Sequence, residues 1–363
     1  MSEEVKLLKG NEAIALAAIR YGCDGYFGYP ITPQSEVLET LMEQQPWDTT
    51  GMVVLQAESE VAAINMVYAG AACGKVVFTS SSSPGVSLMQ EGISYIAAAE
   101  LPALIVNVQR GGPGLGTIQP SQADYFQATK GGGHGDYHLI VLAPSSVQEM
   151  VDFVALGWDL AFKYRTPAMI LADGVIGQMM EKVTLPPQRR RRTMEELIKQ
   201  CPWAVTGKKG RDKNICTSLE LESDKMEIIN NRLQSTYRDI ARHEKRYEAY
   251  NVEGADYLIV AFGSIARICR KSIDIARERG LHIGLIRPIT LWPFPSEAVA
   301  QAASGTKGVL TVEINAGQMI EDVRQAINDR AMPIEHYGRL GGMVPDPEEV
   351  LDALNRLLIN PTK

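Results

Sequence analysis

Four places along the chain carry polar side chains that could act together on a small organic anion. Thr32 lies in the run 28–33 (GYPITP), Glu60 and Arg110 each follow an apolar segment, and serines fill positions 80–83. A guanidinium group offers two parallel donors to a carboxylate, and a hydroxyl group can add a further hydrogen bond. This combination indicates a site in which the guanidinium and hydroxyl groups bind a small anion, while the carboxylate contacts a second bound group.

The sequence predicts that each of these positions follows a β-strand. Short apolar runs end near 28, 56, 79 and 108, and helical patterns follow them. We expect the run 52–56 to be a buried strand. Strands of about five residues that alternate with helices predict an α/β fold, with a mainly parallel sheet and helices on both faces. Because parallel strands end at one edge of a sheet, this edge should gather the four polar groups.

Two prolines make the first of these loops stiff. Pro30 and Pro33 fix their own φ angles and bias Tyr29 and Thr32 towards extended geometry. Apolar residues at helical spacing follow from Val37 onwards. Thr32 should therefore sit in a rigid turn between a strand and a helix.

The pattern divides the chain into three parts. Residues 1–186 form a first α/β domain that opens with an amphipathic helix over 7–20, and residues 253–363 form a second α/β domain. Residues 187–252 read as a linker that contains a surface helix from Asp224. The run Arg189–Arg192 within it is interpreted as exposed linker rather than as a functional basic patch.

Composition excludes several classes of protein. The net charge of −7 argues against nucleic-acid binding. No stretch approaches the roughly 18 apolar residues that a membrane span needs. Met1–Lys6 lacks the shape of a signal peptide, so we expect a cytoplasmic protein. The five cysteines lie far apart without a C-x-x-C pair, which argues against a disulfide framework, a zinc site or an iron–sulfur cluster in this chain.

The glycine-rich loops do not match nucleotide-binding motifs. Residues 111–116 lack the phosphate-loop pattern, and no G-x-G-x-x-G occurs around residues 22–28, which speaks against an NAD-dependent dehydrogenase. His134, His138 and His282 show no metal-ligand spacing, so no metal site is expected in this chain.

Three motifs together resemble a known family. GYPITP at 28–33, Ser59–Glu60 at the start of a small-residue helix and Arg110 at the end of a strand resemble the α subunit of the 2-oxoacid:ferredoxin oxidoreductases. The later IRPITLWPFP at 286–295 is similar to the transketolase C-terminal-type domain of these enzymes. The likeness covers residues 5–186 and 253–358. It is strongest to the branched-chain type, which acts on 3-methyl-2-oxobutanoate (2-ketoisovalerate), with the 2-oxoglutarate type as the alternative.

The resemblance implies a thiamine diphosphate-type pyrimidine-binding domain followed by a transketolase C-terminal-like domain. It also implies that Glu60 contacts the aminopyrimidine ring and activates the cofactor, because a carboxylate on a ring nitrogen favours the tautomer that accepts the thiazolium proton. Glu58 is the second candidate. Thr32 and Arg110 match the residues that bind the substrate carboxylate. The plainer alternatives are a helix-start acid for Glu60 and a surface ion pair for Arg110.

The resemblance further implies that this chain holds half of a cofactor site. The superfamily's diphosphate half carries Gly-Asp-Gly followed by an Asn, and no Gly-Asp-Gly occurs here. A β subunit should therefore bring that half, with Mg²⁺ and [4Fe-4S] clusters on partner subunits only. Small γ and ferredoxin-like δ subunits are also implied, and ferredoxin and coenzyme A act at the level of the holoenzyme. The remaining rival is a non-catalytic assembly protein with the same fold.

Overall fold

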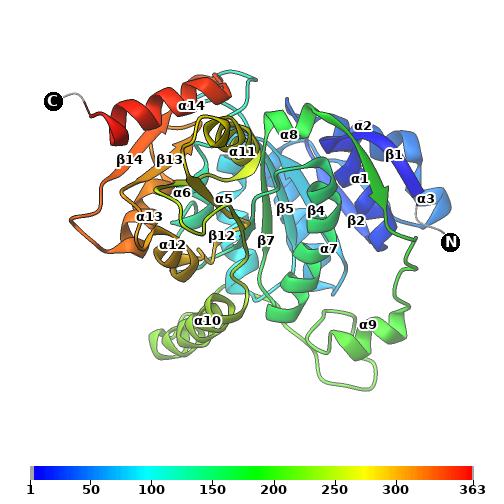
Figure 1. Cartoon of the computed structure of the whole chain (residues 1–363). Helices are drawn as coiled ribbons and strands as arrows, with labels where there is room; N and C mark the ends of the chain where they lie inside the picture. The colour runs from blue at the N-terminus through cyan, green and yellow to red at the C-terminus, as the bar shows by residue number, and fades with distance from the viewer. Residues whose placement is uncertain (1–3, 362–363) are drawn as a thin grey trace.

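The computed structural model describes residues 4–361, so Met1–Glu3 and the last two residues lie outside the description. Figure 1 shows two α/β units side by side, with the chain termini on opposite sides of the molecule. The first unit is built on a seven-stranded sheet and the second on a five-stranded sheet. No helix among the described residues has the length and apolar character needed to cross a membrane.

The seven-stranded sheet is parallel except at one edge, as the alternating pattern predicted. Its strand order is β12-β6-β7-β5-β4-β2-β3, and only the β12–β6 pair is antiparallel. The strands are β2 (Gly25–Gly28), β3 (Val53–Gln56), β4 (Val77–Ser81), β5 (Leu104–Gln109), β6 (Ile140–Leu142), β7 (Ala168–Asp173) and β12 (Thr290–Trp292).

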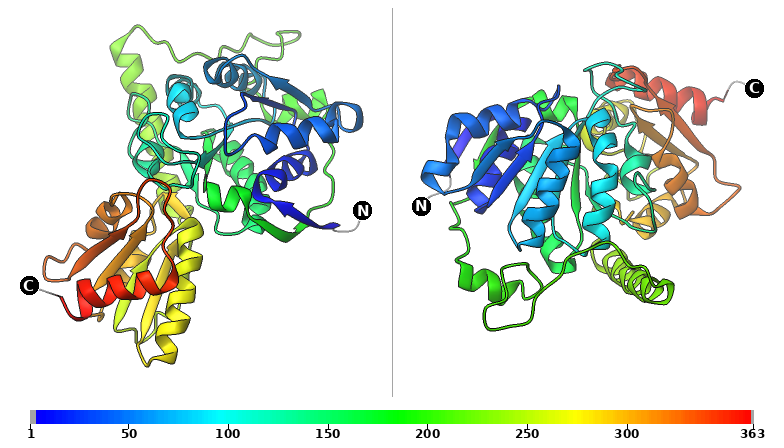
Figure 2. Two further views of the ribbon diagram at one scale, coloured as in Figure 1. Left: turned by 90° about the horizontal axis from the view of Figure 1, so that it is seen from above. Right: turned by 180° about the vertical axis from the view of Figure 1, so that it is seen from behind.

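Helices cover both faces of this sheet. α1 packs against α7, and α4 packs against α5; the view from behind in Figure 2 places the second pair on the face opposite the first. The helices are α1 (Gly10–Tyr21), α2 (Glu36–Gln44), α3 (Pro46–Thr49), α4 (Glu60–Ala72), α5 (Ser83–Ala98), α6 (Tyr125–Thr129), α7 (Val147–Tyr164) and α8 (Gly174–Gln178).

Helices α4 and α5 pack closely at a glycine of α5. A Cβ added at Gly92 of α5 would lie 2.5 Å from a methyl carbon of Ile64 of α4.

One strand prediction was wrong about burial. β4, β5, β6 and β7 are buried along their whole length, but Val53 and Leu55 of β3 remain 50% and 40% exposed. β3 is the last strand of its sheet, and within residues 4–361 it pairs only with β2. The apolar strand β3 therefore forms an open edge of the sheet and is not a central strand.

The helix predicted over 7–20 begins later than expected. Residues Glu4–Lys9 form strand β1, which pairs antiparallel with β8 (Met180–Leu185), and α1 starts only at Gly10. A strand far along the chain supplies the pairing partner, and this long-range contact overrides the local helical spacing. Gly10 packs so tightly that a Cβ there would lie 2.1 Å from the carbonyl oxygen of Ile176.

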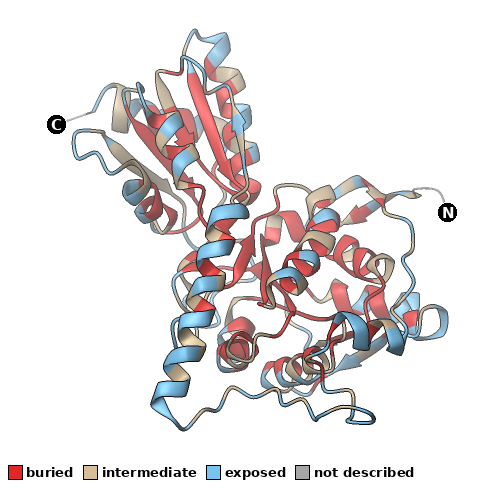
Figure 3. Ribbon diagram, turned by 90° about the horizontal axis from the view of Figure 1, so that it is seen from below, coloured by how far each residue is buried: buried red, intermediate tan, exposed pale blue. Residues whose placement is uncertain are grey.

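The segment 187–252 is more ordered than the sequence suggested. It contains α9 (Met194–Gln200), which was not predicted, then α10 (Ser223–His243) and β9 (Tyr247–Tyr250). Figure 3 shows that α10 is largely exposed, as expected for a surface helix.

The arginine run in this segment is only partly the exposed linker that was predicted. Arg191 Nη2 lies 2.7 Å from Asp24 Oδ1, and Arg192 Nη2 donates to Gly74 O at 2.8 Å. These two side chains tie the segment to the first unit.

The second unit has strand order β14-β13-β10-β11-β9, with β9 antiparallel and the other neighbours parallel. β12 leaves this part of the chain to pair with β6, which ties the two units together. The remaining elements are β10 (Tyr257–Val260), α11 (Gly263–Glu278), β11 (Ile283–Pro288), α12 (Ser296–Ala303), β13 (Val309–Glu313), α13 (Met319–Ile327), β14 (Ile334–Gly338), α14 (Pro347–Leu354) and a π-helical turn (Asn355–Ile359).

Candidate active site

Buried hydrogen bonds hold the Pro-Ile-Thr-Pro loop against the end of β4. Tyr26 is fully buried, and its hydroxyl lies 2.9 Å from Ser80 Oγ. Ser80 Oγ in turn donates to Gln34 Oε1 at 2.5 Å, just after the loop. Burial raises the pKa of Tyr26 to about 12, so the phenol stays neutral in this chain of bonds. Gly28 is required here, because a Cβ would lie 2.1 Å from the Tyr26 hydroxyl oxygen.

Glu60 is the first residue of α4 and is only 6% exposed. Ser59 caps this helix, because its Oγ accepts a hydrogen bond from Ala62 N at 3.2 Å. The Glu60 side chain lies against α5: a Cβ added at Gly85 would be 2.6 Å from Glu60 Oε1. Among residues 4–361 no donor bonds to this carboxylate, and Glu58 is exposed. Burial therefore favours Glu60 over Glu58 as the acid of a site.

Arg110 follows β5 and is 8% exposed. Its Nη1 donates to Thr32 O at 3.0 Å and its Nη2 donates to Leu115 O at 3.1 Å, whereas its buried Nε has no partner among residues 4–361. No carboxylate in the described part of the chain forms an ion pair with it. A buried cation without a counter-ion is costly, so this geometry fits a site that is completed by a bound anion. A surface ion pair, the plainer alternative for Arg110, is excluded.

A cavity of about 630 Å³ opens beside Arg110. Its walls come from both units: Ser83, Pro84, Arg110 and Asp124 from the first, and Ile314, Asn315, Gln318 and Leu340 from the second. This volume suits a small organic molecule. The wall of the cavity includes apolar residues, among them Pro84, Ile314 and Leu340, besides the Arg110 cation.

One turn of α5 connects the two predicted charged residues. Ser83 Oγ accepts from Arg110 N at 3.1 Å and donates to Arg110 O at 3.2 Å. Two residues later, Gly85 contacts Glu60. The predicted gathering of Arg110 with the serine cluster, and of Glu60 with the same turn, is thus seen in the structure.

Thr32 is only partly brought into this arrangement. Its backbone carbonyl accepts from Arg110, but its side chain lines a neighbouring hollow of about 640 Å³ together with Glu36, Ile118 and Gly174. The expected role of the hydroxyl group in binding a carboxylate stays a prediction.

Sequence reasoning missed Asp124. Its carboxylate Oδ2 accepts from Asn107 Nδ2 at 2.9 Å, and the residue lines the cavity. Burial raises its pKa, although hydrogen bonds with Ser83 and Asn107 partly offset this. A single acid after a glycine-rich loop gives no signal of such a role, because only the fold brings it to the same cavity as Arg110.

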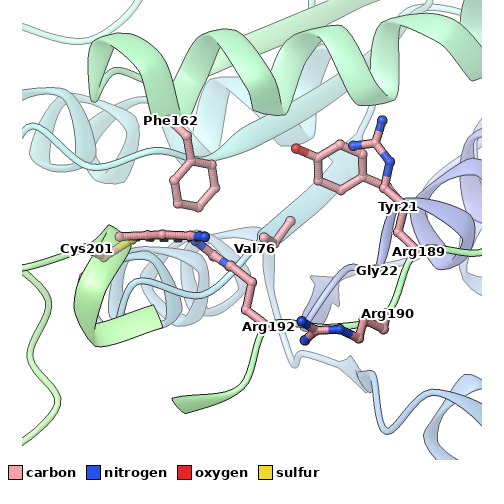
Figure 4. Close-up of a pocket in the computed structure, with 9 residues that line it drawn as sticks. Tyr21, Gly22, Val76, Phe162, Arg189, Arg190, Arg192 and Cys201 are labelled. Carbon is pink, nitrogen blue, oxygen red and sulfur yellow. Dashed lines mark hydrogen bonds between the residues drawn. The ribbon is translucent and has the colours of Figure 1, made fainter. Parts of the chain in front are cut away.

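A different cavity, of about 350 Å³, lies at the other end of the sheet (Figure 4). Gly22 and Val76 in its wall precede β2 and β4, so it lies at the amino ends of the strands. Two of its arginines have partners within the chain. Arg190 forms an ion pair with Glu196, and Arg189 Cζ lies 4.7 Å from the centroid of the Tyr21 ring. This cavity is therefore not a candidate for the chemistry at the Arg110 edge.

Family comparisons cover nearly the whole chain. The family described as "Pyruvate flavodoxin/ferredoxin oxidoreductase, thiamine diP-bdg" matches residues 16–248, and the "Pyruvate:ferredoxin oxidoreductase core domain II" matches residues 255–350. These matches, with the parallel sheets described above, confirm the predicted fold class.

Individual relatives point the same way. A ketoisovalerate oxidoreductase subunit VorB from Methanothermobacter thermautotrophicus is 46% identical, with 97% of each chain covered. A 2-oxoglutarate synthase subunit KorA from Archaeoglobus fulgidus is 36% identical over 93% of this chain and 96% of its own. A solved 2-oxoglutarate:ferredoxin oxidoreductase from Magnetococcus marinus superposes with a TM-score of 0.84 at 28% identity. It covers 98% of this chain, but this chain spans only 65% of that longer one.

Proposed function

The chain belongs to the 2-oxoacid:ferredoxin oxidoreductase family, and on that premise we propose that it is the α-type subunit of an enzyme that oxidatively decarboxylates 3-methyl-2-oxobutanoate. The holoenzyme converts this acid, coenzyme A and oxidised ferredoxin into the acyl-CoA, CO₂ and reduced ferredoxin. The single observation that supports this most is Arg110, a buried guanidinium without a counter-ion that faces a cavity for a small anion.

The cavity wall favours a branched aliphatic acid over 2-oxoglutarate. Among the described residues that line it, Arg110 is the only cation, and Asp124 is an acid. One carboxylate can bind Arg110, but a second carboxylate would find no positive partner and would face Asp124. Pro84, Ile314 and Leu340 instead offer apolar contact to a short branched side chain.

The residues present fit one half of a thiamine diphosphate site. Glu60 is a buried carboxylate with no donor from the described residues, and Gly85 leaves the space beside it that a Cβ would fill. The buried hydroxyls of Ser81 and Ser82 also lack hydrogen-bond partners within the described part of the chain. When bound, the cofactor supplies the nucleophile that attacks the 2-oxo carbon and the electron sink for loss of CO₂.

The chain's own residues then have three tasks. Glu60 holds a hydrogen bond at a carboxylate oxygen and so sets the protonation of the ring nitrogen that it faces. The free N–H groups of Arg110 bind the substrate carboxylate. Thr32, which lines the neighbouring hollow, is proposed as a further hydroxyl donor to the same anion. Leu340, which is exposed beside the cavity, offers apolar contact to the substrate side chain.

The remaining parts of the proposal concern the assembly. We propose a β subunit that carries the diphosphate-binding half with Mg²⁺, [4Fe-4S] clusters on partner subunits, and γ and ferredoxin-like δ subunits. The limits 1–186, 187–252 and 253–363 are kept as the proposed division of the chain, and a cytoplasmic location stays a prediction from the sequence.

Replacement of Glu60 by Gln tests the proposed function. The change keeps the volume and removes the charge, so turnover of 3-methyl-2-oxobutanoate by the reconstituted complex should fall by at least about 100-fold, the usual contribution of a positioned acid or base. Co-purification of the subunits should not change. Glu58→Gln is the matched control and should keep full activity. Full activity in Glu60→Gln would exclude the catalytic assignment and leave the assembly protein as the better interpretation.

A further inference from the structure

The loop after Arg110 is closed on itself. Arg110 and Pro120 pair in an antiparallel bridge. Gly111 N donates to Gln119 O at 2.9 Å, and Thr117 N donates to Gly111 O at 2.8 Å. The Arg110 guanidinium binds a carbonyl oxygen inside this loop, at Leu115. The position of the guanidinium therefore depends on where the whole loop 111–120 is anchored.

The anchor is Gln122, which is fully buried between the two units. Its side-chain Oε1 accepts from Ile314 N at 3.2 Å, and its Nε2 donates to Phe262 O at 2.9 Å. Its backbone N donates to Ile314 O at 3.2 Å, and its carbonyl oxygen accepts from Asn315 Nδ2 at 2.8 Å. Each of these bonds ends on the second unit. Gln122 thus joins the strand ends of the second unit to the base of the loop.

The second unit also touches the loop itself. A Cβ added at Gly342 would lie 2.3 Å from Gln119 Cβ, so the Gly342 backbone packs closely against the Gln119 side chain. Leu340 and Asn315 of the same unit line the cavity beside Arg110. The loop is held between Gln122 at its base and Gly342 at its side.

We propose that Gln122 is a positioning residue for Arg110: through it, the second unit fixes the loop and the guanidinium that binds the substrate carboxylate. This inference rests on the proposed function for the identity of that anion. It gives the second unit a defined role in substrate binding, because its strand ends fix the position of Arg110, the cation in the cavity wall.

A purely structural role makes a different prediction. Loss of the Gln122 bonds leaves Ile314 N and Phe262 O without side-chain partners, which lowers stability in either case. Only a positioning role also weakens binding of the 2-oxoacid. The two are separated by measuring KM and kcat of the assembled complex together with its thermal midpoint.

The test uses Gln122→Leu in the reconstituted complex, with whichever 2-oxoacid the unaltered complex prefers. KM for the 2-oxoacid should rise by about tenfold or more while kcat changes little, as expected when one well-placed ionic hydrogen bond is lost. Ser264→Ala is the matched control: it removes a bond of 2.7 Å to Asp173 at the same junction but does not touch the loop. It should lower the thermal midpoint and leave KM unchanged.

Two further measurements keep the proposal falsifiable. In an Arg110→Lys background, Gln122→Leu should raise KM less than threefold, because residues that act through one another are not additive. Limited proteolysis of the complex should cut within Gly111–Gly116 faster in Gln122→Leu than in Ser264→Ala, whatever the substrate. If Gln122→Leu fails to assemble, Gln122→Glu keeps the acceptor for Ile314 N and should show a smaller rise in KM together with faster cleavage.

Each contrary result overturns the inference. An unchanged KM in an assembled Gln122 variant, an equal rise in Ser264→Ala, or a full effect in the Arg110→Lys background would each show that Gln122 is only structural. A failure of the proposed function looks different: the unaltered complex would turn over no 2-oxoacid. In that case unchanged proteolysis of the loop would also refute the anchoring.

Discussion

Gly85→Ala is the sharpest perturbation of the Glu60 site, because it moves the carboxylate without removing it. The new Cβ would stand 2.6 Å from Glu60 Oε1 and 2.1 Å from Ser81 Oγ. Ser81 Oγ has no hydrogen-bond partner and can rotate away. Glu60 must retreat by about 0.8 Å to reach an ordinary contact of 3.4 Å.

The expected loss is large in activity and small in stability. Misplacement of a catalytic group by about 1 Å costs roughly 100-fold in rate, so kcat with 3-methyl-2-oxobutanoate should fall by about that factor. Gly85 lies in α5, where Ala is favoured over Gly by about 1 kcal/mol, and this offsets part of an overpacking cost of about 1–3 kcal/mol. The thermal midpoint of the complex should therefore move by only a few degrees.

The assay is viologen reduction by the reconstituted complex, with thermal unfolding measured on the same samples. Gly92→Ala is the matched control, because it crowds Ile64 across the same α4–α5 contact, where the added Cβ would be 2.5 Å from a methyl carbon. It should destabilise without a comparable loss of kcat. Wild-type kcat in Gly85→Ala, or an equal loss in both variants, would refute the reasoning that links Gly85 to the Glu60 carboxylate.

Three other predictions follow from the same geometry. Arg110→Lys keeps the charge but loses the paired donors, so KM for the 2-oxoacid in steady-state assays should rise by about 10- to 100-fold; an unchanged KM would contradict carboxylate binding there. Burial raises the pKa of Asp173, so its contribution to stability is present at acidic pH and is lost as pH rises through the folded-state pKa. Asp173→Asn should therefore flatten the pH dependence of unfolding above about pH 4, the usual pKa of an aspartate, and an unaltered slope would contradict this. Val53→Lys, on the open edge of the sheet, should leave the thermal midpoint of the isolated chain unchanged and abolish co-purification with partner subunits, whereas the equally exposed Val5→Lys should not; retained assembly would exclude this edge as a contact.

The parts of the fold that could be predicted are those set by local pattern. α7 (Val147–Tyr164) is an element of this kind, because its apolar stripe and the capping residue Ser146 are local signals. β1 was missed, because it becomes a strand only when β8 arrives from residues 180–185. β3 looked buried because apolar residues also fill an open sheet edge, and the sequence does not carry the strand order.

In the candidate site, too, the residues set by local pattern could be predicted, and those set by long-range contacts could not. Glu60 and Arg110 stand at strand ends, so a parallel sheet was enough to place both at one edge. Asp124 and Gln122 lie beyond a glycine-rich loop, and their roles depend on contacts with Asn107 and with Ile314, a residue of the second unit. Such contacts join residues whose separation in the sequence follows no regular pattern, so they could not be predicted from residue spacing. The roles of Thr32, Glu60 and Arg110 stay predictions until variants are assayed.

The most direct test of the central claim is the substrate preference of the assembled enzyme. The chain would be co-expressed with its candidate partner subunits, and viologen reduction followed with coenzyme A and either 3-methyl-2-oxobutanoate, 2-oxoglutarate or pyruvate. The account predicts the highest kcat/KM for 3-methyl-2-oxobutanoate, because Arg110 is the only cation among the described residues in the wall of the cavity. Preference for 2-oxoglutarate would agree with the proposed type of reaction but contradict the proposed substrate. No turnover of any 2-oxoacid by an assembled, cluster-loaded complex would contradict the account itself.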